Sequence, residues 1–393
     1  MTTTPTIIEF EAKVRDFYQS VPALLDGITG KIARGKTYRR ALCDAGLAGV
    51  SMPEEVGGQG LDPEYETALR RVSLPLLPSE ESLFGIGLGM AVPTLRDHAS
   101  PELQRRFIPP ALRGDEIWCQ LYSEPGAGSD LAGLTCRAVR DGDEWIVTGQ
   151  KVWTSGAQHA DLGILIARTD SDLPKHRGIT MFVIDMRQPG VTVQPLVQMT
   201  GVAEFNEVFL DEARIPHDWV VGDVNGGWGL AVALLAHERS SLGRGTTTAA
   251  DGKSKAGRQP LPYDALLERA RRQGRADDPL IRQALATAYI GERLVPWIAQ
   301  RKLHPSIGKL WRTIQGWHAA QLAHELGGPL GAAWESDDVD ADYWAYHVLN
   351  CRGMSLGGGT DEIQKNTLGE RVLGLPREPG PDRDTPFRDL PHN

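Results

Sequence analysis

The segment Leu121-Tyr122-Ser123-Glu124-Pro125-Gly126-Ala127-Gly128-Ser129-Asp130 (the 121–130 segment) combines glycine and alanine with flanking hydroxyl side chains. Small residues leave room for a ligand to lie against bare backbone, whose N–H groups can hold polar or anionic atoms. Ser123 and Ser129 place a hydroxyl on each side of this turn. Because a surface loop uses the same residue types, the segment indicates a binding site only in combination with other parts of the chain.

The length and composition of the chain limit what it can be. A chain of 393 residues exceeds one ordinary core, and its length predicts two or three domains. An apolar content of 41% and a charged content of 24% are typical of a soluble globular protein, and the net charge of -9 argues against a nucleic-acid partner. No apolar run is long enough to span a membrane, and no secretory signal is expected at the start. The four cysteines are scattered without the spacing of a metal site, which favours a cytoplasmic location.

Apolar residues at helical spacing predict a helical region over residues 1–115. Residues 82–95 form one predicted helix of this region, and Pro101 marks the start of another. The helical period returns over residues 223–380, interrupted by an insert at 246–262 that is rich in Gly, Lys, Thr and Ser. We therefore expect two helical regions separated by a part of different character.

That middle part, residues 116–222, contains β-branched and aromatic runs that alternate with turn residues. Asp141-Gly142-Asp143 and Pro189-Gly190 are turn signals that predict the ends of hairpins, so we expect a small antiparallel β domain. The residues after Pro376 are rich in proline and arginine, which predicts a frayed tail. The predicted organisation is a helical domain at 1–115, a β domain at 116–222, a helical domain at 223–380 and a tail at 381–393.

Four separated segments together resemble the acyl-CoA dehydrogenase family. They are the 121–130 segment, Gly149-Gln150-Lys151-Val152-Trp153-Thr154-Ser155-Gly156, residues 201–216, and Gly357-Gly358-Gly359-Thr360-Asp361-Glu362-Ile363-Gln364 with the following 370–376. The resemblance covers nearly the whole chain in the family's order. It implies an α+β fold in which an N-terminal helical domain, a middle antiparallel β-barrel domain and a C-terminal helical bundle follow one another.

The resemblance also implies a cofactor, a reaction and partners. The cofactor would be FAD, and the reaction would be α,β-dehydrogenation of an acyl-CoA thioester with electrons passed to an electron-transfer flavoprotein. The family usually assembles as a tetramer, so a homotetramer or a heterotetramer with a related subunit is expected. The residues that the resemblance assigns to FAD are Leu121, Tyr122, Ser123, Gly128, Ser129, Trp153, Thr154, Ser155, Gly328, Thr360 and Glu362. Those that it assigns to the substrate are Ser129, Arg239 and Gly359.

The catalytic base is where this sequence departs from most of the family. The usual base is a Glu immediately before a Gly-Thr pair, and Gly358 stands at that position. Glycine cannot take a proton, although its backbone N–H can still donate to a developing enolate oxygen. A subset of the family carries its base on an earlier helix directly before an Arg, and Glu238 followed by Arg239 matches that pattern. We therefore expect Glu238 to be the base and Gly358 to be a backbone donor.

A second departure concerns the adenine end of FAD. The family's Arg-x-x-Phe-Gly segment has no match in residues 273–279, where Arg275 is a possible substitute. His324, shortly before Gly328, stands where the family has a Gln that reaches FAD across a subunit contact.

Two alternative functions remain open on the sequence alone. Loss of the usual Glu is compatible with a non-catalytic or complementary subunit of a hetero-oligomeric dehydrogenase. The same fold also supports oxidase or monooxygenase chemistry on bound flavin. Members with the base on the earlier helix include enzymes for branched or bulky acyl chains, so such substrates are favoured.

Overall fold

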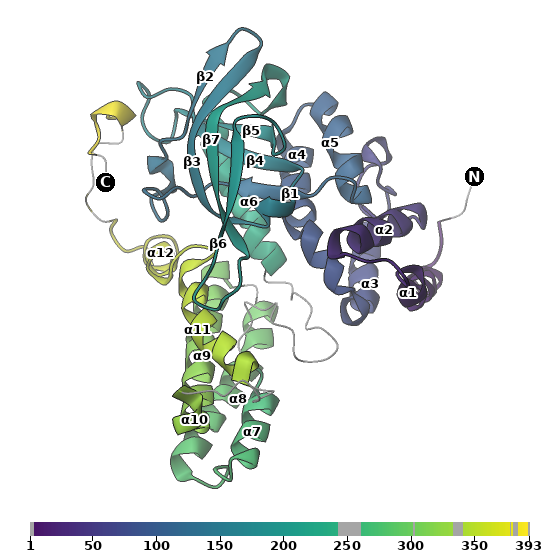
Figure 1. Ribbon diagram of the computed structural model, residues 1–393, viewed down its shortest axis with the longest axis vertical. Helices are drawn as coiled ribbons and strands as arrows, with labels where there is room; N and C mark the ends of the chain where they lie inside the picture. The colour runs from purple at the N-terminus through teal and green to yellow at the C-terminus, as the bar shows by residue number, and fades with distance from the viewer. Residues whose placement is uncertain are drawn as a thin grey trace. The chain divides into compact units, whose positions relative to one another are not determined.

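The computed structural model describes residues 4–242, 261–301, 303–332, 341–377, 379 and 384–391 (Figure 1). The chain forms two compact units, each described by itself. Unit 1 comprises Met1–Leu196, Ala203–Ser241 and Pro381–Asn393, and unit 2 comprises Val197–Val202 and Leu242–Gly380. Most of the predicted insert at 246–262 lies outside the described residues. No described helix is both long and apolar enough to cross a membrane.

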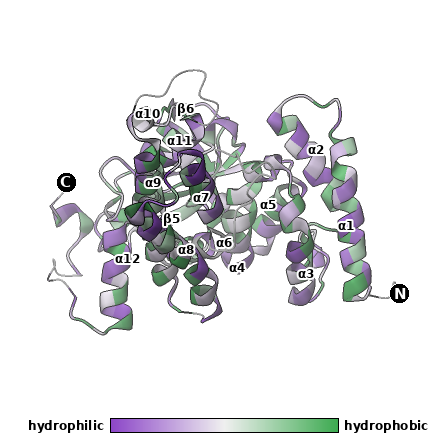
Figure 2. Cartoon of the chain, turned by 90° about the horizontal axis from the view of Figure 1, so that it is seen from below, coloured by the Kyte–Doolittle hydropathy of each residue, from purple (hydrophilic) through white to green (hydrophobic). Residues whose placement is uncertain are grey.

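Helices form the start of unit 1, as the periodicity predicts. Their bounds are α1 Ile7–Leu24, α2 Lys31–Asp44, α3 Pro63–Ser73, α4 Val92–His98 and α5 Pro101–Arg113, with short 3-10 turns at Glu54–Val56, Leu74–Leu76 and Ser79–Phe84. Thr6 and Glu9 close a capping box at the start of α1, and Ser100 caps α5. Figure 2 shows both hydrophilic and hydrophobic residues on α1, whose buried face includes Phe10 and Val14.

The predicted helix at 82–95 is wrong as a single element. The structure instead contains the 3-10 turn that ends at Phe84, a π-helix at Gly87–Ala91 and then α4. A Cβ added to Gly87 would lie 3.2 Å from Trp118 Cδ1, so this backbone packs closely against the first strand. Wider π turns and glycine accommodate that contact where a regular α-helix with larger side chains would not.

The middle of unit 1 is one eight-stranded sheet. Its strands are β1 Trp118–Leu121, β2 Arg137–Asp141, β3 Glu144–Ser155, β4 Leu162–Arg168, β5 Ile179–Asp185, β6 Val191–Leu196, β7 Phe205–Pro216 and β8 Val220–Val221. The order is β6-β7-β3-β2-β4-β5-β8, with β1 beside β4. Asp141-Gly142-Asp143 joins the antiparallel β2 and β3, as predicted.

Two expectations about the sheet need correction. The sheet is not purely antiparallel, because β1 runs parallel to β4. Pro189-Gly190 closes no hairpin, since β5 pairs with β4 and β8 whereas β6 pairs with β7. A Cβ on Gly190 would lie 2.5 Å from the carbonyl oxygen of Asp211. Glycine at this turn therefore allows β6 to lie close to β7.

The central strands β4 and β5 are buried on both faces, which explains their continuous apolar sequence. One face, with Ile164 and Met181, packs against Leu95, Phe107 and Leu234 from the helices. The other face packs against apolar residues of β3 and β7. The helical and β parts of unit 1 therefore share a core.

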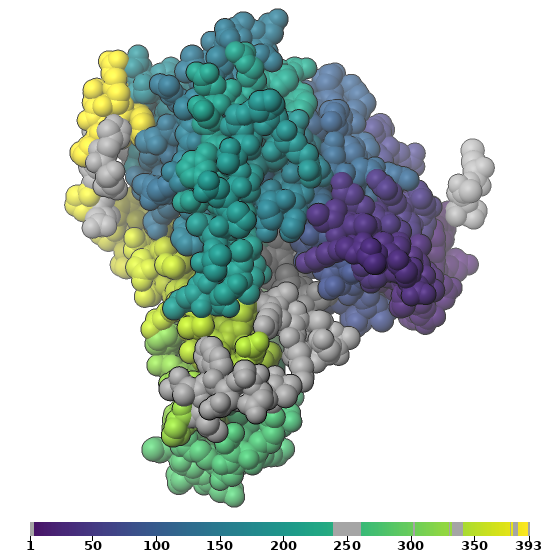
Figure 3. Space-filling view, viewed as in Figure 1, coloured from purple at the N-terminus to yellow at the C-terminus, as the bar shows by residue number. Residues whose placement is uncertain are grey.

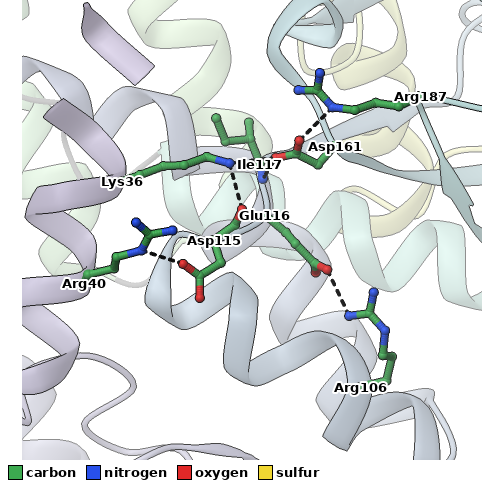
Figure 4. Close-up of polar contacts among 8 residues, drawn as sticks. All are labelled: Lys36, Arg40, Arg106, Asp115, Glu116, Ile117, Asp161 and Arg187. Carbon is green, nitrogen blue, oxygen red and sulfur yellow. Dashed lines mark hydrogen bonds and ion pairs between the residues drawn. The ribbon is translucent and has the colours of Figure 1, made fainter. Parts of the chain in front are cut away.

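A charged network joins the N-terminal helices to the first strand (Figure 4). Lys36 on α2 donates to the Asp115 carbonyl at 2.8 Å and lies 3.3 Å from the Asp161 carboxylate. Asp161 also accepts from the backbone N–H of Ile117 at 3.0 Å and from Arg187 at 2.8 Å. Because Ile117 directly precedes β1, this network fixes where β1 enters the sheet and thus where the 121–130 segment begins.

Part of the predicted frayed tail is instead packed on the sheet domain. Phe387 is 7% exposed, and its backbone N–H donates to the Leu173 carbonyl at 2.9 Å. Its ring lies 3.7 Å from the guanidinium carbon of Arg168 on β4. Figure 3 shows the C-terminal residues, in yellow, beside the sheet domain. The expectation failed because composition reports the local polarity of the tail but not the aromatic anchor within it.

Unit 2 is helical, as predicted. Its helices are α7 Tyr263–Arg272, α8 Pro279–Gln300, α9 Pro305–Gly327, α10 Pro329–Ala332, α11 Ala341–Leu356 and α12 Asp361–Thr367, followed by a π-helix at Leu368–Val372. Leu266, Ile281 and Leu322 contribute to its apolar core. The helix α6, Gly227–Leu242, lies in unit 1 as far as Ser241. It follows the sheet and packs on it through Leu230 and Leu234.

Candidate active site

The 121–130 segment leaves the sheet at the end of β1 and turns back at once. Glu124 and Ala127 exchange two backbone hydrogen bonds, of 3.0 and 3.1 Å. Leu121 and Tyr122 are buried, Ser123 is half-buried, and Gly128 and Ser129 are exposed. A Cβ added to Gly126 or Gly128 would meet no atom within 4 Å among the described residues. The turn therefore presents bare backbone and the Ser129 hydroxyl to open space, as a ligand wall requires.

Trp153 lies near the end of β3 in an unusual conformation. Its φ is +61°, and the indole is 59% exposed with an edge-to-face contact to Phe205. The pairing of β3 with β7 shifts between Lys151 and Thr154, so Trp153 occupies a bulge. An aromatic side chain in the core of the sheet would be buried, and Trp153 is not. A strained exposed aromatic is more typical of a ligand site.

The two hydroxyl residues after Trp153 have different surroundings. Thr154 is 1% exposed, and its Oγ1 has no hydrogen-bond partner in the described part of the chain. Its carbonyl accepts from Asn206 Nδ2 at 2.9 Å. Ser155 is half-buried. Thr154 thus faces inward, whereas Trp153 faces solvent.

These residues fit the flavin that the sequence implies. The open backbone at Gly126 and Gly128 leaves room for a flat ring, and Trp153 offers an exposed aromatic face. The Thr154 hydroxyl is a buried polar group for which the described residues supply no partner, as expected where a ligand supplies one.

Glu238 lies in unit 1 together with these segments. It is 9% exposed, near the end of α6. Burial, together with the charge of Glu238, holds the pKa of the Tyr122 phenol well above its usual range. The charge of Glu238 therefore acts on Tyr122, the second residue of the 121–130 segment. The Tyr122 hydroxyl itself is buried and makes no hydrogen bond to another described residue.

The other predicted glycine turn lies in unit 2, between α11 and α12. Gly358 and Gly359 have φ values of +68° and +85°, in the left-handed region that favours glycine. The Gly358 carbonyl accepts from Gln364 Nε2 at 2.9 Å, and Gln364 Oε1 accepts from the Ser306 hydroxyl at 2.5 Å. Thr360 caps α12 by accepting from the Ile363 N–H.

The remaining predicted site residues are placed as follows. Glu362 is exposed in the first turn of α12, and Gly328 ends α9 with a φ of +53°. Arg275, the possible adenine-end substitute, donates to the Glu325 carbonyl at 2.8 Å and pairs with Asp278. The side chain of Arg239 lies outside the described part of the chain. Glu238, the 121–130 segment and Trp153 thus belong to unit 1, whereas the residues from Gly328 to Glu362 belong to unit 2.

Sequence reasoning missed one buried pair within the site. Lys151 is 0% exposed and lies 2.8 Å from Glu124. A lysine within an otherwise β-type strand was the available signal, because a fully buried lysine is rare without a partner. No cluster of metal-binding side chains occurs among the described residues.

Comparisons with known proteins show the family of this chain. The family model described as "Acyl-CoA dehydrogenase, N-terminal domain" matches residues 4–115, and the one described as "Acyl-CoA dehydrogenase, middle domain" matches residues 119–213. The acyl-CoA dehydrogenase IpdE1 of Mycobacterium tuberculosis is 38% identical over 94% of this chain and 98% of its own length.

Two solved structures are similar over most of their length. The Tcur3481-Tcur3483 steroid ACAD has a TM-score of 0.73 and 28% identity, over 96% of this chain and 99% of that chain. The ChsE4-ChsE5 complex from Mycobacterium tuberculosis has a TM-score of 0.71 and 26% identity, over 96% of this chain and 100% of that chain. Helical, β and helical regions in this order, with sequence matches across both matched domains, identify the chain as a member of the acyl-CoA dehydrogenase family, whose members are oxidoreductases.

Proposed function

We propose that the protein catalyses FAD-dependent α,β-dehydrogenation of an acyl-CoA thioester, with Glu238 as the base. The observation that carries this proposal is the burial of Glu238, which is 9% exposed, lies in the same unit as the 121–130 segment and acts by its charge on Tyr122 of that segment. A carboxylate held out of water in the unit that contains this segment is suited to removing a proton from bound substrate. Gly358 supplies no carboxylate, which leaves Glu238 as the matching base.

Side chains and backbone groups have different roles in this proposal. Glu238 accepts the proton from the carbon α to the thioester carbonyl. The backbone N–H of Gly358 donates to the oxygen on which negative charge develops. Ser129, Arg239 and Gly359 would orient the thioester. Trp153, Thr154 and Ser155 would hold the cofactor together with Leu121, Tyr122, Ser123 and Gly128. When bound, FAD supplies the acceptor for the hydride that leaves the β carbon.

We further propose a bulky acyl chain and a related partner subunit. Support comes from the similar structures, of which one is described as a steroid ACAD and the other as a complex of two differently named chains. Both cover nearly the whole of this chain. The family's electron-transfer flavoprotein would accept the electrons, in the cytoplasm.

A second candidate function is a complementary subunit that holds FAD or substrate only together with its partner. Gly358 favours this candidate, because the residue that usually takes the proton is missing there. Purification of the chain alone separates the two. A yellow protein with about one FAD per chain supports a self-sufficient enzyme, whereas a colourless chain that becomes yellow on co-expression with a related subunit supports the second candidate.

The variant Glu238→Gln tests the base. It keeps the shape of the side chain but cannot accept a proton, so we expect FAD to remain bound. Exchange of the substrate α-hydrogen in D₂O should fall by about 10²–10⁴-fold, the usual contribution of a general base. Nuclear magnetic resonance of a CoA-thioester panel, from short acyl chains to a steroid-bearing acid, measures this exchange.

Glu80→Gln is the matched control, since Glu80 is also buried but pairs with Arg34 at 2.6 Å in the helical part. It should exchange the α-hydrogen as the wild type does. Wild-type exchange in Glu238→Gln would remove Glu238 as the base. Rapid reoxidation of reduced flavin by oxygen alone would instead indicate an oxidase.

A further inference from the structure

Lys151 and Glu124 form an ion pair inside the sheet domain. Lys151 lies on β3, two residues before Trp153, and Glu124 lies in the 121–130 segment. Their side chains are 0% and 5% exposed, and Lys151 Nζ lies 2.8 Å from Glu124 Oε1. The same ammonium group donates to the Tyr122 carbonyl at 3.1 Å. One lysine therefore binds two groups of the segment that we propose as a flavin wall.

The carboxylate of Glu124 is held from its other side as well. Its Oε2 accepts from the Thr135 N–H at 2.7 Å and from the Thr135 hydroxyl at 2.9 Å, and its Oε1 accepts from the Cys136 N–H at 3.0 Å. Burial opposes ionisation of Glu124, but the charge of Lys151 and these donors hold its pKa below the usual range. The carboxylate thus closes the loop that begins at Glu124 and ends where β2 begins.

The backbone adds a further connection between the same two segments. The N–H of Val152, which follows Lys151, donates to the Ser123 carbonyl at 2.8 Å. Groups of three consecutive residues, Tyr122, Ser123 and Glu124, are therefore bound by two consecutive residues of β3. The two residues of β3, Lys151 and Val152, directly precede Trp153, which lies in the bulge with a φ of +61°.

Stability alone does not explain a pair of this kind. Replacing a buried ion pair by apolar groups of similar volume is often neutral or stabilising, whereas removing one partner leaves an uncompensated charge. A left-handed, non-glycine residue such as Trp153 persists only where its surroundings over-determine it. The connections from Lys151 and Val152 to the 121–130 segment supply that constraint on one side of Trp153.

We propose that the Lys151–Glu124 pair is a positioning device that locks the 121–130 segment to Trp153, so that both hold the flavin ring in a fixed geometry. The proposal rests on the proposed function for its ligand. The locking itself is a property of the chain and can be measured without FAD. Lys151 and Glu124 act through the backbone that they hold, and they need not touch the cofactor.

The test compares Lys151→Met, Glu124→Gln and the double variant. In the apoprotein, we expect amide hydrogen exchange in residues 121–136 and 152–156 to become at least about tenfold faster in each single variant, because local opening rises when a buried charge loses its partner. FAD titration should show at least about tenfold weaker binding, and the visible absorption bands and midpoint potential of the bound flavin should shift. The double variant should regain thermal stability but not FAD affinity or the wild-type spectrum.

Arg34→Met is the matched control, because it also leaves a buried carboxylate, that of Glu80, without its partner. It should lower stability without changing flavin binding or exchange in residues 121–136. If Lys151→Met does not fold, Thr135→Val removes only one hydroxyl donor from Glu124 and should give the same effects on a smaller scale.

The outcomes separate the two proposals. Unchanged exchange and an unchanged flavin spectrum in variants that are merely less stable would overturn the positioning role. Parallel recovery of stability and FAD affinity in the double variant would also overturn it. A wild-type chain that binds no FAD, alone or with a partner, would overturn the proposed function, while faster exchange in the variants would still support the locking of the two segments.

Discussion

At the scale of single residues, left-handed backbone occurs at predicted site residues of both units. Trp153 adopts a φ of +61° although it carries a large side chain, and Gly358 and Gly359 adopt +68° and +85° in the other unit. At the glycines the conformation carries no Cβ penalty, but for other residues it costs about 1–2 kcal/mol. Gly358 therefore suits its turn in a way that the glutamate usual in the family would not.

The variant Gly358→Glu tests this compatibility. We expect it to lower the free energy of unfolding of the helical unit by about 1–2 kcal/mol, because the added Cβ strains the left-handed turn. Thermal and urea unfolding measure the change. Gly353→Glu is the control, since Gly353 lies exposed inside α11, where glutamate favours the helix over glycine by about 0.5–1 kcal/mol. A Gly358→Glu protein as stable as the wild type would show that the turn does not select glycine.

At the scale of elements, the C-terminal 3-10 turn Phe387–Asp389 is attached to the loop between β4 and β5, where the Phe387 N–H donates to the Leu173 carbonyl. Phe387 covers Arg168, whose guanidinium donates to the Ala132 carbonyl at 2.6 Å and to the Lys175 carbonyl at 2.8 Å. Burial lowers the pKa of Arg168 to about 10. Arg388 also pairs with Asp172 at 2.7 Å. The tail thus covers the Arg168 guanidinium, which binds the carbonyls of Ala132 and Lys175.

Phe387→Ala should release the tail from the sheet. Loss of the buried ring should weaken docking by about 3–5 kcal/mol, the range for Phe→Ala changes at buried sites. Limited proteolysis should then cleave at residues 384–391 much faster than in the wild type, with little change in global unfolding. Phe387→Leu is the control, because it keeps apolar burial but removes the aromatic face over Arg168. Equal protease resistance of Phe387→Ala and the wild type would contradict this account of docking.

At the scale of the whole molecule, apolar side chains remain exposed on unit 2. Ile290 and Trp297 on α8 are 55% and 59% exposed, and their spacing of seven residues puts them on one helix face. Exposed apolar surface of this kind is typical of protein contacts. We expect this face to contact the related subunit that we propose as a partner.

Trp297→Glu should weaken that assembly. A charge at the centre of an apolar contact is desolvated without a partner, so the variant should sediment as smaller species than the wild type. Sedimentation velocity of the chain, alone and co-expressed with a related subunit, measures the shift. Ile8→Glu is the control, because Ile8 is an apolar residue of α1 that is 80% exposed. An unchanged sedimentation coefficient for Trp297→Glu would place the subunit contact elsewhere.

Several features of this protein followed from local sequence. Pro101 marks the start of α5, and Asp141-Gly142-Asp143 marks the β2–β3 turn, because helix starts and tight turns need particular residues at fixed positions. The family followed from four segments in a fixed order. The absence of a carboxylate at Gly358 is also a property of the sequence alone.

Other features depended on contacts between distant parts of the chain. Lys151 meets Glu124 across 27 positions, and Arg388 meets Asp172 across 216. The inward Thr154 beside the exposed Trp153 reflects a bulge in the pairing of β3 with β7, and the π-helix at Gly87 reflects its contact with Trp118. Periodicity and turn residues report only what a residue prefers beside its neighbours in sequence. Which buried charge finds a partner, and which strained backbone is held in place, is decided by packing between distant segments.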